Sequence, residues 1–510
     1  MIIYKKKFSF FAFVFVSLNS ILQGAAPVEE NTYITLRSPG SSNIEFIGWH
    51  ELLANQNKKI EGTHIQISGF YGSLNNHVDL GGAFLRRGHN TFAMTVNEPS
   101  TDAEDGRHYV YNGATITDNT TIPPTKTGRD SISADCIQIT PSQERYGVQF
   151  NILQNLNPYF PGFYAGFNAT IAQVSNSVNL LVLNQNSAVN GLTVTDYFNG
   201  KQGPSCTIAS SESATAYTGA QKALLYSKLD NTKHTKLGAC NTELFLGYTC
   251  ITTDDQYLGI HGAIAFPTDS KSTCTFLFEP RVGWQFWGTG VGINYTKTLF
   301  KKPNQTLSIA ANLEYRYFFT EVEKRTLDLL NYANTAEPDF GRYALFTTVG
   351  AAANTDLFPA ANVLTRNFYV TPGSRLEGTV LLNYNLYGAS FNIGYNLYFK
   401  DAEMGSLKDM WPENTYGLPS VDYDITLALN TANTDDFQNL NPIYNNSMIN
   451  INAALSDSQL THKFFIGVGF TETKNRFPCS FNIGGAYEIA DNRRSAAQGF
   501  EGWAKVGLSF

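Results

Sequence analysis

Opposite charges recur two residues apart in segments where apolar and polar side chains alternate. Glu314 is followed by Arg316 and Arg375 by Glu377, and similar segments carry Glu488 and Lys505. Charges that face a water-filled passage set its selectivity, because each one attracts or repels the passing solute. The alternative is that they pair with one another and only stiffen a wall. These six residues are therefore candidate pore-lining groups.

Motifs for other chemistries are missing from the sequence. None of the eight histidines belongs to an H-E-x-x-H motif, and there is no G-x-S-x-G nucleophile elbow and no C-x-x-C pair. We therefore predict no enzymatic activity, no metal and no cofactor. A barrel enzyme with Ser and His on neighbouring strands stays an alternative, with His261 and His462 as its histidines.

The elements that would position these charges are strands with one apolar and one polar face. Counting back from Phe510, Leu508 and Val506 share one face, and Lys505 and Trp503 share the other. The same alternation recurs at residues 146–152, 258–266, 305–319, 376–384, 389–399, 464–470 and 481–489. Such segments approach the 9–11 residues that a tilted strand needs to cross a bilayer.

The chemistry of the polar face distinguishes a membrane barrel from a soluble sandwich, which also alternates. The polar face here is rich in Asn, Gly, Ser and Thr with scattered charge, which suits a water-filled lumen. Aromatic residues such as Tyr317 and Phe399 gather at strand ends, as in interfacial girdles. Short and long connections take turns between residues 241 and 420. We predict an all-β fold, a transmembrane antiparallel β-barrel of about 14–16 strands with long external loops.

The start of the chain has the order of a secretory signal peptide. Three lysines at positions 5–7 precede an apolar run at 8–16, and Gly24, Ala25 and Ala26 follow. No later segment has 18 uninterrupted apolar residues, which argues against a helical membrane protein. We predict a signal peptide at 1–26, a polar N-terminal lead at 27–61 and the barrel at 62–510. The lead is either periplasmic or an inner-barrel segment.

Net charge and cysteine content limit the possible binding partners and disulfides. The formal net charge of −7 argues against nucleic-acid binding, which needs a basic surface. Six cysteines allow 15 pairings, and an oxidising compartment permits disulfides. Cys206 and Cys240 flank one polar stretch, so a bridge between them is the predicted disulfide.

Three segments resemble porin-like outer-membrane proteins of intracellular bacteria, of the major-outer-membrane-protein type. They are Leu277-Phe-Glu-Pro-Arg-Val-Gly283, the hairpin around 301–305, and the ending Gly502-Trp-Ala-Lys-Val-Gly-Leu-Ser-Phe510. The likeness runs from about Ile132 to the end. It implies a channel-forming barrel with variable surface loops. The terminal Phe510 is similar to the signal that the barrel-assembly machinery reads.

The predicted function is an outer-membrane porin that lets small hydrophilic solutes diffuse passively. Its expected partners are outer-membrane lipid, the barrel-assembly machinery and these solutes, and homo-oligomerisation stays open. The alternative is a surface adhesin or structural barrel, whose loops at 175–240 and 320–373 would bind a host or envelope partner. A transporter of hydrophobic compounds is a further alternative.

Overall fold

The computed structural model describes the barrel strands and much of the chain that connects them. The described residues are 31–39, 62–84, 90–96, 114–117, 134–184, 193–202, 205–208, 217–220, 222–330, 338–339, 341–343, 345–348, 358–413, 415–417, 449–472, 477–491 and 496–510. The predicted signal peptide at 1–26 lies outside them. Within these ranges no helix has the length and apolar character needed to cross a membrane.

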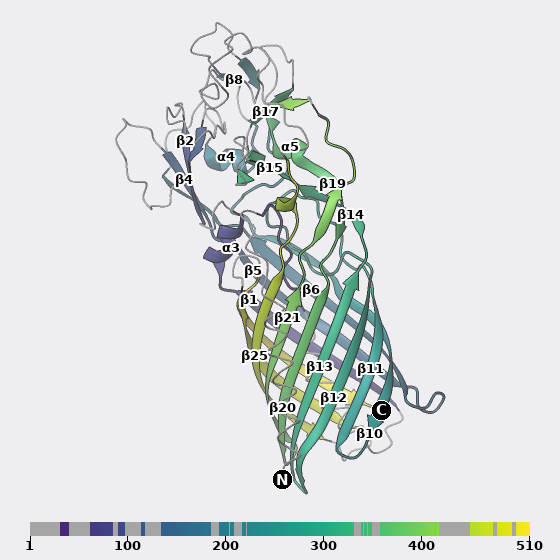
Figure 1. The fold of residues 1–510 in the computed structure, drawn as a ribbon. Coiled ribbons are helices and arrows are strands. Elements are labelled where there is room, and N and C mark those ends of the chain that lie inside the picture. Colours follow the sequence, from purple (N-terminus) through teal and green to yellow (C-terminus); the bar gives the residue numbers. More distant parts are fainter. Residues whose placement is uncertain are drawn as a thin grey trace, which may run out of the picture.

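Twelve antiparallel strands close into a barrel (Figure 1). Around the ring they are β1 (Thr63–Leu74), β27 (Gly499–Ser509), β26 (Cys479–Ala490), β25 (Gln459–Glu472), β21 (Ala389–Lys400), β20 (Arg375–Leu386), β13 (Gln305–Phe318), β12 (Gly288–Lys302), β11 (Gln256–Ala265), β10 (His234–Thr252), β6 (Phe163–Ser177) and β5 (Ser142–Asn155). The ring closes at β1, where Ile67 lies between Val506 of β27 and Phe150 of β5. Closure leaves no strand edge without a partner, as lipid requires. The predicted barrel is therefore confirmed.

The predicted strand number of about 14–16 is wrong, because the ring holds twelve strands. β21 pairs directly with β25, so the described residues between them, 401–413, 415–417 and 449–458, add no strand to the wall. The strands β2 (Thr91–Val96) and β4 (Ala134–Ile139) pair with each other outside the ring. Alternation identifies a strand, but only hydrogen bonding to neighbours decides to which sheet it belongs.

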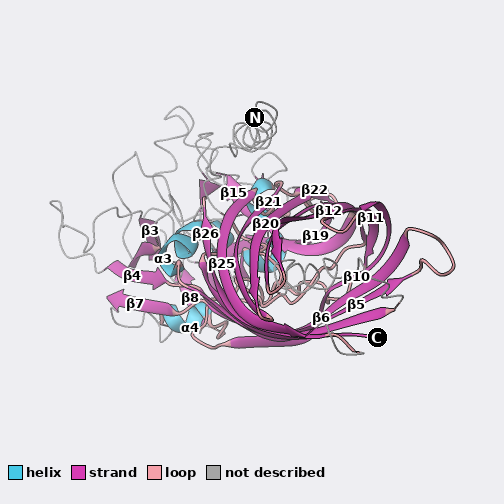
Figure 2. Cartoon of the chain, turned by 90° about the horizontal axis from the view of Figure 1, so that it is seen from below, coloured by secondary structure: helices cyan, strands magenta, loops and turns pink. Residues whose placement is uncertain are grey.

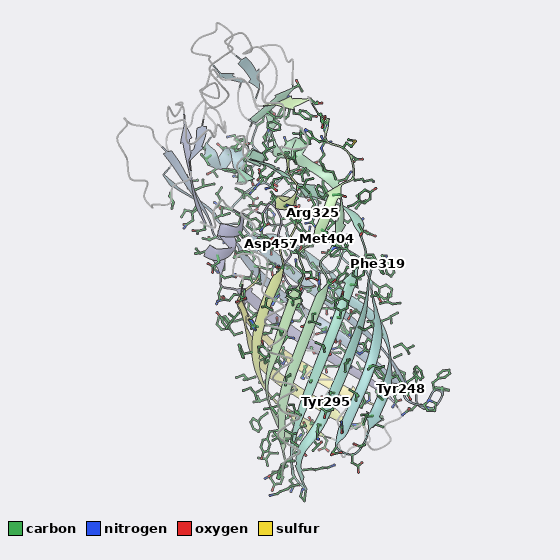
Figure 3. The ribbon with its side chains drawn as sticks, in the orientation of Figure 1. Tyr248, Tyr295, Phe319, Arg325, Met404 and Asp457 are labelled. Atoms are coloured by element: carbon green, nitrogen blue, oxygen red, sulfur yellow. The ribbon has the colours of Figure 1, made fainter. Side chains whose placement is uncertain are left out.

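The wall has an apolar outer face and a mainly polar inner face. On β27, Phe500, Val506 and Leu508 are exposed, whereas Glu501 and Lys505 are buried inside. Exposed apolar side chains continue around the barrel, far beyond what a soluble surface carries. Aromatic side chains lie toward both ends of the wall, for example Tyr248 and Phe319 in Figure 3. This is the distribution of a barrel that spans a bilayer.

Connection lengths differ between the two ends of the barrel. The hairpins β10–β11, β12–β13 and β20–β21 turn within a few residues at the end that carries the C-terminus (Figure 1). The long connections emerge at the opposite end and fold into a cap above the barrel. In membrane barrels the short turns are periplasmic and the long loops external.

The cap consists of short helices and small sheets. Its elements are α3 (His77–Phe84), β2, β3 (Ala114–Thr117), β4, β7 (Leu180–Asn184), α4 (Val194–Phe198), β8 (Ser205–Ile208), β9 (Tyr217–Ala220), β14 (Glu321–Thr326), β15 (Asp328–Leu330), β16 (Pro338–Asp339), η2 (Gly341–Tyr343), β17 (Leu345–Thr348), β18 (Phe358–Pro359), α5 (Ala361–Leu364), β19 (Thr365–Thr371), β22 (Met404–Leu407), β23 (Tyr416–Gly417), β24 (Ile449–Asn450) and η5 (Asn452–Ala454). Phe84, Phe198, Phe346 and Phe368 belong to one buried cluster that joins α3, α4, β17 and β19 of the cap.

Candidate functional site

The inner face of the barrel collects the charges that the alternation singled out. Glu314, Glu377, Glu488 and Lys505 are buried on the lumen side, and Arg316 points the same way. Strand alternation places them there because each stands out of phase with its apolar, lipid-facing neighbours. Their inward orientation therefore agrees with the sequence, whereas their role in selectivity stays a prediction.

Arg316 joins two strands that lie on different parts of the wall. Its Nε and Nη2 donate to the two carboxylate oxygens of Glu243 on β10, at 2.6 and 2.9 Å. The same Nη2 lies 2.5 Å from the carboxylate of Glu314. A guanidinium held by two carboxylates therefore links β13 to β10 on the inner face of the wall, past β12 and β11.

Two like-charged pairs lie directly opposite each other on β13 and β20. Glu314 faces Glu377, and Arg316 faces Arg375. Such pairs repel each other and are unfavourable unless each charge also has a partner that attracts it. The Arg375 guanidinium stacks over the Phe318 ring at 4.6 Å. Arg316 acts on Glu377 only at longer range, since its guanidinium is paired with Glu243 and Glu314, so among the described residues neither β20 nor β13 offers Glu377 an ion pair.

A second ionic cluster lies on the neighbouring strands. Arg145 of β5 binds Glu501 of β27 at 2.9 Å. Lys463 of β25 lies 3.6 Å from Glu501 and 3.8 Å from Glu488 of β26. All of these charges come from wall strands, like those of the Arg316 group.

Residues 31–39 enter the mouth of the barrel from the cap side. The Asn31 and Thr32 amides donate to Ala83 and Ala453 of the cap, at 2.9 and 2.8 Å. Further in, the Asn241 side chain of β10 donates to the Pro39 carbonyl at 2.5 Å. This segment belongs to the predicted N-terminal lead, and it takes the inner-barrel position of the two that the sequence left open.

Arg37 carries the charge of this segment into the lumen. Its Nη1 donates to Glu488 at 3.0 Å, and its Nη2 donates to Glu377 and, at 3.0 Å, to Asn396 of β21. The guanidinium also lies 4.6 Å from the centre of the Tyr398 ring. Arg37 therefore supplies the cation that pairs with Glu377, and it links β20, β21 and β26 on one part of the inner wall.

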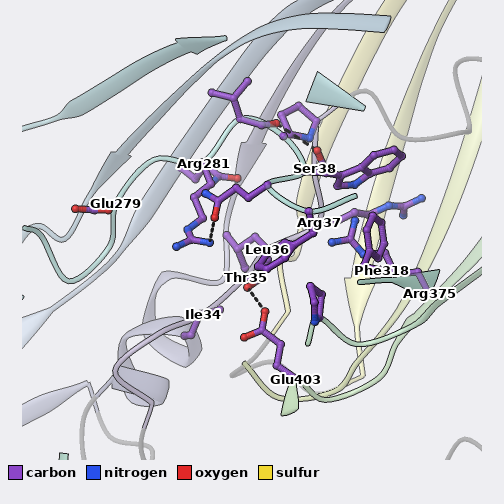
Figure 4. A pocket seen from close by; sticks show the side chains of 18 of the residues that line it. Ile34, Thr35, Leu36, Arg37, Ser38, Glu279, Arg281, Phe318, Arg375 and Glu403 are labelled. Carbon is purple, nitrogen blue, oxygen red and sulfur yellow. Dashed lines mark hydrogen bonds between the residues drawn. The ribbon is translucent and has the colours of Figure 1, made fainter. Parts of the chain in front are cut away.

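The connection at 267–287 also folds inward beside this segment. Val282 is buried, and its carbonyl accepts a hydrogen bond from Ser38 at 3.2 Å. The two inserted segments line an open pocket, shown in Figure 4 with the Thr35–Glu403 hydrogen bond drawn. In the view from below in Figure 2, the wall strands curve around a common interior, and the contacts of residues 31–39 with Asn241 and Glu488 place this inserted segment within it. A twelve-stranded ring leaves room for the inserted segments, because eight strands suffice for side chains alone.

The lumen below this level is polar and narrowed by aromatic rings. Phe465 and Trp503 pack edge to face with ring centres 6.3 Å apart. The Trp503 indole donates to Asn482 at 3.3 Å. Buried Asn, Gln, Ser and Thr side chains cover much of the remaining inner wall.

The two histidines of the enzyme alternative lie on opposite faces of the wall. His261 is on the lumen side beside Asn294, at 3.2 Å, whereas the His462 ring contacts the Tyr395 hydroxyl at 2.6 Å on the outer side. They cannot belong to one site. No group of metal-ligating side chains is found among the described residues.

The predicted disulfide between Cys206 and Cys240 is wrong, because Cys240 is a free, buried thiol. Cys240 lies on the inner face of β10, with its Sγ 3.7 Å from the Pro39 carbonyl. Cys206 belongs to β8 high in the cap (Figure 1). The polar stretch between the two cysteines folds into the cap and does not bring them together.

Several residues of the site were not singled out from the sequence. Glu243, Lys463 and Glu501 occupy polar positions of alternating strands, so a systematic search of polar faces would have found them. Arg145 stands at a similar position on β5. Arg37 has no such signal, because it stands in a polar segment without periodicity.

No family model matches the chain. No curated protein sequence matches it either. Among solved structures, the chain is similar to an outer membrane channel from Pseudomonas putida F1, with 7% identity and a TM-score of 0.37 over 89% of this chain and 98% of that one. It is also similar to the transport unit of the autotransporter AIDA-I from Escherichia coli, with 8% identity and a TM-score of 0.31 over 91% and 97%.

A third similar structure is the toluene transporter TodX of Pseudomonas putida, with 7% identity and a TM-score of 0.30 over 96% and 98% of the two chains. Likenesses at this level carry no argument about activity or solute. The assignment as a barrel therefore depends on the closed ring of paired strands. The finer resemblance to the major-outer-membrane-protein type stays a prediction.

Proposed function

We propose that the protein is an outer-membrane channel of the porin kind, through which small hydrophilic solutes diffuse passively. The observation that carries the proposal is the inner face of the wall. It presents ionised and amide side chains such as Arg316, Glu377 and Asn396, whereas the outer face is apolar. A lumen with hydrogen-bonding groups and charges can replace part of the hydration of a small polar solute.

Location and assembly are parts of the same proposal. A closed barrel with an apolar belt and short turns at one end is typical of outer-membrane proteins. Export through the signal peptide at 1–26 and recognition of Phe510 by the assembly machinery would bring it there. We propose no catalytic role and no cofactor, and homo-oligomerisation stays open.

Single-channel recording on the refolded protein in planar bilayers tests the channel. We expect discrete conductance steps, and they should grow more frequent or larger in Arg37→Ala, because Arg37 and its segment occupy part of the lumen. Heat-modifiable gel migration serves as the folding control. The proposal would be overturned if the wild type and Arg37→Ala both fold into barrels and neither conducts current.

The cap favours external recognition as the second candidate function. Long connections that only tether strands do not need a core, yet Phe84, Phe198 and Phe346 are fully buried within the cap. A folded external surface suits an adhesin or structural contact in the envelope. Binding of the intact protein to host cells, compared before and after proteolytic trimming of the cap, would decide this.

A further inference from the structure

We propose that Glu377, Glu488, Asn396 and Tyr398 form a guanidinium-binding site in the lumen, which Arg37 occupies in this conformation. Solutes that carry a guanidinium group would compete with Arg37 for the same site. This proposal names the solute class for the proposed channel and therefore rests on that function. The binding site itself is argued from its own geometry.

The geometry of the site matches a guanidinium group better than other cations. Three acceptors surround the two terminal nitrogens of Arg37: Glu488 at 3.0 Å from Nη1, and Glu377 and Asn396 around Nη2. The Tyr398 ring covers one side of the group at 4.6 Å. A planar fork can meet separate acceptors and an aromatic ring at once, whereas an ammonium is a single compact charge.

The wall holds the acceptors in place without help from Arg37. The Asn396 amide donates to Glu377 at 3.0 Å and to the Thr379 hydroxyl at 2.7 Å. The Thr461 hydroxyl donates to Glu488 at 2.6 Å. All of these residues belong to barrel strands, so the site persists when residues 31–39 withdraw.

Removal of Arg37 would leave a deficit of positive charge at Glu377. Among the described residues, Arg37 is the cation that pairs with Glu377, whereas Glu488 also has Lys463 at 3.8 Å and Arg145 at 3.9 Å. Glu377 moreover faces Glu314 directly across the strand pair. A carboxylate in this position attracts a replacement cation, because a buried charge without a partner is unfavourable.

Arg37 is attached to the site through a segment that can exchange its contacts. Around Arg37 the segment forms no strand, and side chains of the wall hold its backbone: Gln459 donates to the Thr35 carbonyl at 2.6 Å and Arg145 to the Arg37 carbonyl at 3.3 Å. The charged head of Arg37 therefore acts as an internal competitor for a solute of the same chemistry. Withdrawal of the segment would open the passage at the same time.

Calorimetric titration of the refolded Arg37→Ala protein with L-arginine, and with L-citrulline as its uncharged analogue, measures the site directly. We expect L-arginine to bind at least about tenfold more tightly than L-citrulline, because a charge-assisted contact is lost with the neutral group. The wild type should bind L-arginine at least about tenfold more weakly than Arg37→Ala, since its own Arg37 competes. In the double variant with Arg37→Ala and Glu377→Gln, the preference for L-arginine over L-citrulline should be lost.

Ser38→Ala is the matched control, because Ser38 is in the same segment but contacts Val282 and none of the lumen carboxylates. It should bind L-arginine as the wild type does. Equal binding of both amino acids to folded Arg37→Ala, or binding of neither, overturns the proposal. If the barrel binds L-arginine selectively but conducts no current, the guanidinium site stands and the channel function fails.

A measurement on the wild type covers the case in which Arg37→Ala does not fold. Cys240 lies beneath Pro39, so withdrawal of the segment should expose its thiol. L-arginine, but not L-citrulline, should speed the reaction of Cys240 with a water-soluble maleimide by a factor of about three or more, by shifting the segment toward its released state. Equal rates with the two amino acids would contradict competition.

Discussion

Arg316 illustrates how single side chains determine the interior of this barrel. It lies between Glu243 and Glu314, and all three are almost fully removed from water. Burial of ions is costly, and hydrogen-bonded partners offset that cost. The charges that the sequence suggested as free selectivity groups are therefore also structural groups.

Replacing Glu243 with Gln should destabilise the barrel by about 3 kcal/mol, because the Arg316 guanidinium then loses one of its two carboxylates in a buried place. Urea unfolding in vesicles, followed by tryptophan fluorescence, measures the change. Glu321→Gln is the control. Glu321 pairs with Lys271 at 2.8 Å near the surface, so its loss should change stability by no more than about 0.5 kcal/mol. Equal effects of the two substitutions would show that burial of the Arg316 group is unimportant.

At the scale of elements, two inserted segments fill part of the lumen that the twelve-stranded ring encloses. Residues 31–39 and 267–287 pack against each other and against the inner face of β10. Residues 267–287 come so close to β10 that position 283 must be a residue without a side chain. A Cβ on Gly283 would lie 2.6 Å from the Cys240 Cα and 3.0 Å from the Ala239 carbonyl oxygen.

Gly283→Ala should therefore push residues 267–287 away from β10 and lower stability by about 1–3 kcal/mol, as overpacking does. Thermal unfolding gives the stability, and maleimide modification of Cys240 reports the displacement. Gly69→Ala is the matched control, because nothing lies within 4 Å of a Cβ at that position. Unchanged Cys240 reactivity in Gly283→Ala would mean that the segment does not rest on the wall.

The cap holds the inserted segment 31–39 through an ionic group of its own, separate from the two in the lumen. Tyr33 lies between two guanidinium groups, with Arg325 at 3.1 Å and Arg281 at 4.1 Å from the ring centre. Glu323 binds Arg325 at 2.7 Å and Arg281 at 2.9 Å. Burial by itself would raise the pKa of Glu323, but the two arginines outweigh it and hold the pKa below its usual range.

Glu403 behaves in the same way. Burial opposes its ionisation, yet Arg325 and Lys400 lower the pKa of its carboxyl below the ordinary value. A carboxyl whose pKa is depressed in the folded state stabilises that state fully above its unfolded pKa of about 4.3 and loses this contribution as the pH falls through the folded pKa. Acid should therefore loosen the cap and the segment that it holds.

We expect hydrogen exchange of residues 31–39, corrected for intrinsic rates, to be faster below about pH 4 than at pH 6. Mass spectrometry of the peptide that covers the segment measures it. Glu323→Gln combined with Glu403→Gln should exchange quickly at both pH values. A segment that stays equally protected in acid would show that these carboxylates do not hold it.

At the scale of the whole molecule, the ends of the barrel strands close the ring. The Phe510 amide donates to the Thr63 carbonyl at 3.1 Å, and the Thr63 amide donates to the Phe510 carbonyl at 2.8 Å. These bonds use only the backbone. The Phe510 ring itself points outward and is about half exposed.

Phe510→Ser should therefore leave the refolded barrel intact but lower the amount of folded protein in cells, if the ring is an assembly signal. Heat-modifiable migration of the protein from cells and of the protein refolded in detergent compares the two. Phe500→Ser removes another outward aromatic from the same strand and should leave cellular assembly nearly unchanged. A loss of refolding in Phe510→Ser would instead assign the ring a structural role.

The sequence alone determined the kind of wall. Lipid and water impose opposite demands on the two faces of a strand, so the alternation of residues such as Val506 and Lys505 is visible without coordinates. The same alternation placed Glu314, Glu377 and Glu488 inside. It also located most of the wall strands, because the apolar and polar faces of a long strand are visible as alternation in its own sequence.

Only the tertiary structure decided how many strands the ring holds and what fills it. Strands of the cap alternate like strands of the wall, and hydrogen-bond partners alone separate them. Arg37 meets Glu488 across 451 residues of chain, and nothing local in a polar segment predicts so distant a partner. Its position follows from the need of buried carboxylates for a cation, which exists only once the ring has closed around them.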